Sequence, residues 1–72
     1  MFTILKIIGS NIRHYRKALN ISQEKLAKNA GLHRAYVGAV ERGEKNISAN
    51  NIAKTAKELG VEPYILLLKN NR

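Results

Sequence analysis

Apolar residues recur along the chain at intervals of three and four, a spacing that predicts helices and gives no convincing strand. The first predicted helix stops at Asn20, and its apolar face is made of Leu5, Ile8, Ile12, Tyr15 and Leu19. Ser22 is the predicted N-cap of a short second helix, with Leu26, Ala27 and Ala30 as its apolar stripe. Gly31 supplies the positive φ of the turn that ends this helix.

Three further helices are predicted in the second half of the chain. The third runs from about Arg34 to Arg42, and the fourth lies between Ser48 and Gly60. The inward face of the fourth is made of Ile52, Ala53, Ala56 and Leu59. The fifth begins at Pro63 and runs to about Lys69, and residues 70–72 are expected to form a frayed end.

Length and composition fit one small all-α domain over residues 1–72. A chain of this size buries only about 60% of the surface that its unfolded form exposes, so association with a second copy would help to stabilise it. There is no Cys, which excludes disulfides and thiolate metal sites and suits a cytoplasmic location. The apolar segment 1–8 is too short to span a bilayer and is followed by no cleavage site.

The chain is strongly basic, with 13 Lys and Arg against 5 Asp and Glu and a net charge of +8. Such an imbalance favours a polyanion, either nucleic acid or an anionic membrane surface. A membrane-active helix would gather its basic residues on one face, whereas here they are spread over all the predicted helices. A soluble basic protein without a specific partner is the alternative that charge alone leaves open. From the charge together with the pattern of residues 23–42 described next, we expect double-stranded DNA as the partner, with no membrane, small-molecule ligand, metal or cofactor.

Residues 23–42 carry the most informative pattern, two short helices joined by a glycine turn. Their apolar positions would pack the two helices at a steep angle, as in a helix-turn-helix. At 100° per residue the third helix turns Val37 and Val40 inward. Its outward face has two arginines around three small residues: Arg34, Ala35, Gly38, Ala39 and Arg42. An αα-corner without a role in DNA binding is the alternative.

Three groups of residues resemble the Cro/C1-type helix-turn-helix family, also called the Xre family. They are Ser22-Gln23-Glu24-Lys25-Leu26-Ala27, Gly31-Leu32 and Val40-Glu41-Arg42-Gly43. The resemblance extends over about residues 8–67. It implies a compact five-helix, lambda-repressor-like domain that forms a homodimer and reads a pseudo-palindromic operator in adjacent major grooves.

Residues 32–37 and 41–48 are similar to restriction–modification controller proteins. Controllers often carry Thr and Arg where this chain has Ala35 and Lys45. Related sequences also occur in phage repressors and in antitoxins that bind a protein toxin, and both remain alternatives. No constellation of side chains indicates catalysis, so the expected function is a transcriptional regulator and not an enzyme.

The predicted DNA contacts lie in the second and third helices and the loop that follows. Arginine can bond bidentately to guanine, and Ala can meet a thymine methyl group. A Gly38 inside a helix costs about 1 kcal/mol relative to Ala, which indicates a close approach by DNA or at a helix crossing. The residues proposed to bind DNA are Gln23, His33, Arg34, Ala35, Tyr36, Gly38, Ala39, Arg42, Lys45 and Asn46.

Some of these roles come from the resemblance or have a structural alternative. The resemblance implies that Gln23 contacts a phosphate and braces the recognition helix, and that Arg16 pairs with Glu41 to join the first and third helices. Tyr36 could place its hydroxyl on a phosphate or could be a core-edge aromatic. His33 stands where an N-cap belongs.

The predicted fifth helix is apolar on every side, although a surface helix needs only one apolar stripe. Pro63, Leu66 and Leu67, with Val61, are expected to dock on the core. The remaining apolar side chains would be exposed, and an exposed apolar patch usually marks an interface. The predicted homodimer interface is Tyr64, Ile65 and Leu68.

Overall fold

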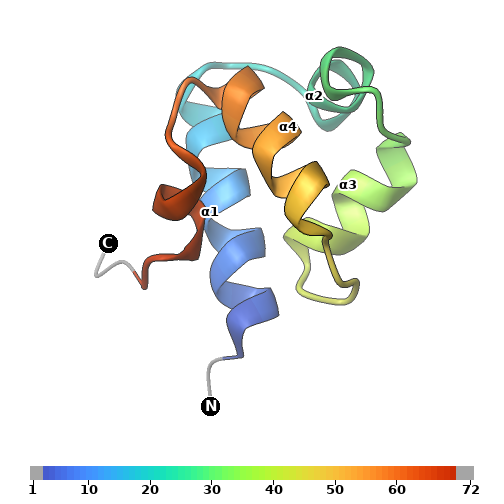
Figure 1. Ribbon diagram of the computed structural model, residues 1–72. Helices are drawn as coiled ribbons and strands as arrows, with labels where there is room; N and C mark the ends of the chain where they lie inside the picture. The colour runs from blue at the N-terminus through green and yellow to red at the C-terminus, as the bar shows by residue number, and fades with distance from the viewer. Residues whose placement is uncertain (1–2, 70–72) are drawn as a thin grey trace.

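The computed structural model describes residues 3–69 as an all-α fold of four α-helices and one 3-10 helix (Figure 1). The elements are α1 (Ile4–Ala18), α2 (Gln23–Ala30), α3 (Arg34–Glu41), α4 (Ala49–Leu59) and the 3-10 helix η1 (Pro63–Leu67). The predicted fold class is confirmed. The frayed end expected at residues 70–72 lies outside the described residues. No helix within residues 3–69 has the length and apolar content that crossing a membrane needs.

Capping residues place the helix boundaries where the sequence indicates. The hydroxyls of Ser22 and Ser48 each accept a hydrogen bond from the backbone N–H three residues later, at 3.0 and 3.1 Å. Gly31 and Gly60 end α2 and α4 with φ values of +71° and +73°, a left-handed conformation that costs glycine little. His33 stands at the N-cap of α3, although its side chain makes no capping bond among the described residues.

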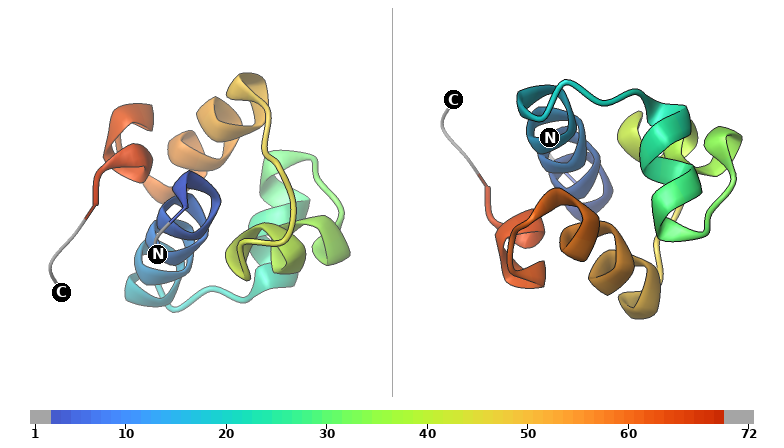
Figure 2. Two further views of the ribbon diagram at one scale, coloured as in Figure 1. Left: turned by 90° about the horizontal axis from the view of Figure 1, so that it is seen from below. Right: turned by 90° about the horizontal axis from the view of Figure 1, so that it is seen from above.

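Helices α1 and α4 pack side by side at the centre of the molecule. Between them they contact every other element, α1 with α3 and η1, and α4 with α2 and η1. The α2–α3 pair lies on one side of them and η1 on the opposite side, as the views in Figure 1 and Figure 2 agree. The core between these elements receives a buried apolar side chain from every one of them. Its members are Ile8, Ile12, Leu26, Ala27, Val37, Val40, Ala56, Leu59 and Leu66.

Two of the predicted apolar faces need correction. Leu19 is 49% exposed, because α1 ends at Ala18 and the chain turns away at Asn20, which has a φ of +60°. On α4 it is Thr55 that is buried, whereas Ala53 is exposed. The inward stripe of α4 therefore follows residues 52, 55, 56 and 59, a regular three- and four-residue spacing that includes one hydroxyl.

Helix α1 crosses the C-terminal end of α3 with backbone almost in contact with backbone. Gly9 is buried at this crossing, and a Cβ placed on it would collide with the carbonyl oxygen of Val40 and lie 2.7 Å from that of Glu41. Gly43, just after α3, is equally close, since its Cβ would lie 2.7 Å from Cγ of Lys6. The glycine in α1 thus sets the distance between the two helices.

The C-terminal element is not the α-helix of residues 63–69 that the sequence predicts. It is a 3-10 helix that ends at Leu67, and Leu68 is extended with a ψ of 130°. Asn11 of α1 explains this ending. Its buried side-chain amide donates to the carbonyl oxygens of Leu66 and Leu68 at 2.9 and 2.8 Å. Because Asn11 occupies these carbonyl groups, they are not the acceptors of a further helical turn.

The 3-10 geometry also changes which side chains of η1 face outward. With three residues per turn, side chains three positions apart share a face. Tyr64 and Leu67 are therefore exposed together, at 60% and 42%, and Leu68 is 50% exposed. Leu66 is fully buried as predicted. The predicted docking of Pro63 and Leu67 on the core is wrong, and Ile65, expected to be exposed, is half-buried.

We predict that Gly9→Ala destabilises the protein, although Ala favours helix formation more than Gly does. Propensity alone would favour Ala by about 1 kcal/mol. The collision with the carbonyl oxygens of α3 should outweigh this gain and cost about 2 kcal/mol or more.

Urea unfolding gives the measurement, and Gly31→Ala is a suitable control. A Cβ at Gly31 meets nothing within 4 Å, so that variant carries only the strain of its positive φ. If Gly9→Ala is as stable as the wild type, the close crossing of α1 and α3 is wrong.

Candidate nucleic-acid interface

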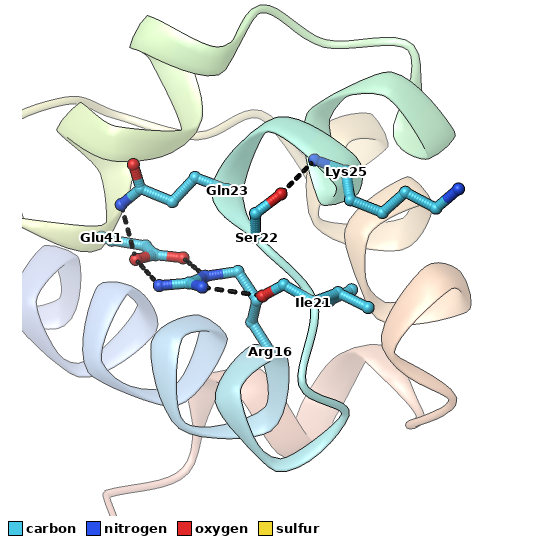
Figure 3. A network of polar contacts seen from close by, with 6 residues as sticks. All are labelled: Arg16, Ile21, Ser22, Gln23, Lys25 and Glu41. Carbon is cyan, nitrogen blue, oxygen red and sulfur yellow. Dashed lines mark hydrogen bonds and ion pairs between the residues drawn. The ribbon is translucent and has the colours of Figure 1, made fainter.

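A buried ion pair joins α1 to α3. Nε of Arg16 lies 2.6 Å from Oε2 of Glu41, and Nη2 lies 3.1 Å from Oε1 (Figure 3). The two side chains are 10% and 3% exposed. The remaining terminal nitrogen of Arg16 donates to the carbonyl oxygen of Ile21 at 2.9 Å and so holds the segment between α1 and α2. The predicted bidentate pair of Arg16 and Glu41 is present, and Arg16 makes this additional bond to Ile21.

Gln23 brings α2 into the same group of contacts. Its side-chain amide donates to Oε1 of Glu41 at 3.0 Å, so one carboxylate on α3 accepts hydrogen bonds from both α1 and α2 (Figure 3). We call these three side chains the Arg16–Glu41–Gln23 network. The family resemblance implies that Gln23 braces the recognition helix, and this bond corresponds to that role. The contact of Gln23 with a phosphate stays a prediction.

Gly38 is buried, and the close approach there is made by the protein's own side chains. A Cβ at this position would lie 3.3 Å from Nη1 of Arg42 and 3.4 Å from Oε1 of Gln23. Gly38 is therefore covered in the free protein, and its contact with DNA stays a prediction. Its lack of a side chain lets Gln23 and Arg42 lie across the outward face of α3.

The exposed part of the predicted recognition helix is its N-terminal end. His33, Arg34 and Ala35 are all exposed there, whereas Ala39 is half-buried. Arg42 is exposed at the other end of α3, where its Nε donates to Oε1 of Glu44 at 3.0 Å. The first turn of α3 thus presents an exposed arginine beside a small residue, a combination suited to base reading in a major groove.

Tyr36 links α3 to the loop and to α4. Its hydroxyl donates to the carbonyl oxygen of Asn46 at 3.2 Å and accepts from the side-chain amide of Asn51 at 3.2 Å. A tyrosine hydroxyl has one hydrogen to donate, and here that hydrogen is used by the loop. The geometry matches the core-edge alternative for Tyr36, with Lys45 and Asn46 exposed in the loop that it holds.

A basic hollow opens to solvent between the C-terminal half of α1, the start of α2 and the end of α3. It is lined by Arg13, Arg16, Lys17, Gln23, Glu41 and Arg42, four cations with one carboxylate. Sequence reasoning missed Arg13 and Lys17. Their four-residue spacing on the polar side of α1 is a signal that could have found them. Such a hollow attracts an anionic polymer such as a phosphate backbone.

A braced two-helix unit with an exposed basic N-terminal turn on α3 and a cationic hollow near the other end of that helix defines a helix-turn-helix domain of the DNA-binding class. The helix-turn-helix family model matches residues 12–66 of the chain. The protein belongs to this family and is a helix-turn-helix transcriptional regulator. The resemblance found in the sequence is confirmed.

Individual relatives agree with this assignment. The control protein C.SmaI of Serratia marcescens is 42% identical over 66 residues, which cover 92% of this chain and 79% of that protein. The crystal structure of the restriction–modification controller C.AhdI from Aeromonas hydrophila has a TM-score of 0.83 and 48% identity, over 86% of this chain and 94% of that one. SinR of Bacillus subtilis, crystallised in complex with DNA, has a TM-score of 0.81 and 34% identity, over 85% of this chain and 98% of that one.

We predict that Arg16→Ala or Glu41→Ala lowers stability by about 3–5 kcal/mol, because either change leaves a buried charge without its partner. Removing both should cost less than the sum of the single changes. A double-mutant cycle by urea unfolding measures this coupling.

Arg42→Ala with Glu44→Ala is the matched control cycle. That pair is also an ion pair of α3, but its side chains are 60% and 61% exposed, so its coupling should be small. Additive losses at Arg16 and Glu41 would show that the two residues do not act as a pair.

Proposed function

We propose that the chain binds duplex DNA sequence-specifically as a homodimer and serves as a restriction–modification controller. The observation that carries this proposal is the exposed first turn of α3, on a helix whose other end is held by the Arg16–Glu41–Gln23 network and borders the basic hollow. The network fixes the direction of α3 before DNA arrives, so the helix meets the groove without first being ordered. A cytoplasmic location, as the sequence predicts, is part of the proposal.

Base reading is assigned to the first turn of α3. Arg34 can extend from its N-terminus to the O6 and N7 edge of a guanine, and Ala35 can meet a thymine methyl group. Phosphate contacts are assigned to residues near the other end of α3, chiefly Arg13 and Lys17 in the basic hollow and Lys45 in the loop. Specificity and general affinity would thus come from different side chains.

The homodimer is assigned to the apolar surface of η1, made of Tyr64, Leu67 and Leu68. These side chains are 60%, 42% and 50% exposed on a small domain, and monomers seldom expose contiguous apolar patches. Element η1 lies on the side of α1 and α4 opposite to α3 (Figure 2), so pairing through η1 would leave both recognition helices free. A two-fold dimer would read half-sites about 34–36 Å apart on a near-palindromic operator.

The controller role is supported by control proteins among the relatives, including C.SmaI and C.AhdI. Genes for a DNA methyltransferase and a restriction endonuclease beside the gene for this chain would agree with it. A neighbouring toxin gene would favour an antitoxin instead, and a prophage setting would favour a phage repressor.

We predict that Arg34→Ala reduces affinity for the operator by about 1–3 kcal/mol and relaxes one position of its sequence. The operator is first recovered by selection with the wild-type protein from duplexes with a random core. Fluorescence anisotropy then compares binding to this operator and to a random duplex.

Arg13→Ala is the control for a phosphate contact. It should weaken binding to both duplexes alike and lower the salt dependence of the affinity. Equal losses on both duplexes after Arg34→Ala would argue against base reading. Wild-type binding to the duplexes that hardly changes with salt would contradict the assigned phosphate contacts.

We predict that Leu67→Asp together with Leu68→Asp yields a folded monomer that binds the operator weakly. Two carboxylates at this surface would have to be buried on association, which is unfavourable without partners. Sedimentation equilibrium measures the oligomeric state, and circular dichroism checks the fold.

Leu19→Asp is the matched control, since Leu19 is similarly exposed but lies outside η1. It should remain dimeric. A double variant that still forms dimers, or a wild type that is monomeric at high concentration, would show that η1 is not the interface.

A further inference from the structure

Glu44 is an acidic side chain within a surface that is otherwise basic. Of the five acidic residues of the chain, only Glu41 and Glu44 belong to α3 or the loop after it. Glu41 is buried in the Arg16–Glu41–Gln23 network, whereas the side chain of Glu44 is 61% exposed. It lies between Arg42 and Lys45 in the sequence, two residues assigned above to the DNA interface. A carboxylate at this place calls for an explanation, because it repels phosphate.

The backbone of Glu44 is fixed relative to α3. Gly43 has a φ of +74°, and its N–H donates to the carbonyl oxygen of Val40 at 3.0 Å. The N–H of Glu44 itself donates to the carbonyl oxygen of Ala39 at 2.9 Å. These two bonds close the helix around a left-handed glycine, as in a Schellman motif. Lys6 of α1 packs against Gly43 and so contacts the same turn.

Glu44 in turn directs the side chain of Arg42. The carboxylate accepts from Nε of Arg42 at 3.0 Å, which leaves the two terminal amino groups for other partners. One of them, Nη1, lies over Gly38, 3.3 Å from where a Cβ would stand. The guanidinium group therefore lies across the outward face of α3. Both members of the pair are about 60% exposed, so the bond contributes little to folding stability, and its effect is on the direction of the guanidinium group.

We propose that Glu44 is a specificity-determining positioning residue of the DNA interface, an inference that rests on the proposed function. Its carboxylate holds Arg42 through Nε, so that the terminal amino groups meet the operator in one orientation. On a random duplex Arg42 gains no such directed contact, and the carboxylate only repels the phosphates. Glu44 thus weakens non-specific binding more than specific binding, and it acts through Arg42.

The test is Glu44→Gln, which keeps the size of the side chain and removes its charge. Binding is measured by fluorescence anisotropy at several salt concentrations, with the selected operator and with a random duplex of equal length. Affinity for the random duplex should rise about threefold or more, because one negative charge beside the phosphates is lost. Affinity for the operator should rise less or fall, so the ratio of the two affinities decreases.

Two comparisons identify the cause. Glu58→Gln removes the same charge from α4 and should leave the ratio unchanged. In an Arg42→Ala background Glu44→Gln should no longer change the ratio, because the side chain that it positions is gone.

An equal change with Glu58→Gln, or a decrease that persists without Arg42, would overturn the inference while leaving the proposed function intact. A wild-type protein that binds neither duplex would overturn the proposed function and the inference with it. Thermal melting of each variant confirms that it is folded.

Discussion

Helices α2 and α3 have eight residues each, too few to hold a fixed direction by themselves, and the carboxylate of Glu41 supplies the missing constraint. It accepts hydrogen bonds from Arg16 and Gln23, so α1 and α2 are both tied to the same point of α3. A buried carboxylate is costly unless it is paired and bonded, and the two partners meet that need. The angle of the helix-turn-helix therefore depends on a polar contact as much as on the thin apolar core beneath it.

This contact is possible because α1 and α3 approach so closely. Gly9 brings the backbone of α1 against the carbonyl groups of Val40 and Glu41, and Arg16, two turns further along α1, then reaches the carboxylate of Glu41 directly. Gly38 plays a similar part on the outward side of α3, where Gln23 and Arg42 lie over it. Gly9 and Gly38 both lie inside helices, where glycine is unfavourable for helix formation. Their lack of a side chain lets α1 approach α3 closely and lets Gln23 and Arg42 lie over α3.

The parts of the fold that local signals specify could be predicted from the sequence. Hydrophobic spacing and the caps at Ser22 and Ser48 located the helices, and the family resemblance supplied the pair of Arg16 with Glu41. Features that depend on residues distant in sequence could not be predicted. Asn11 bonds to carbonyl groups 55 and 57 residues away, which converts the expected last helix into a 3-10 turn and changes its exposed face. The position of Gln23 over Gly38 likewise depends on how α2 and α3 cross.

The bonds of Asn11 also have a consequence for how the domain is made in the cell. Its partners, the carbonyl groups of Leu66 and Leu68, are synthesised more than fifty residues after Asn11. Leu66 also fills the core against α1 and α4. A nascent chain must therefore carry α1 with part of its apolar face uncovered until residue 68 has left the ribosome. Emergence of residues 66–68 from the ribosome, rather than emergence of the helix-turn-helix, is the step at which the domain becomes complete.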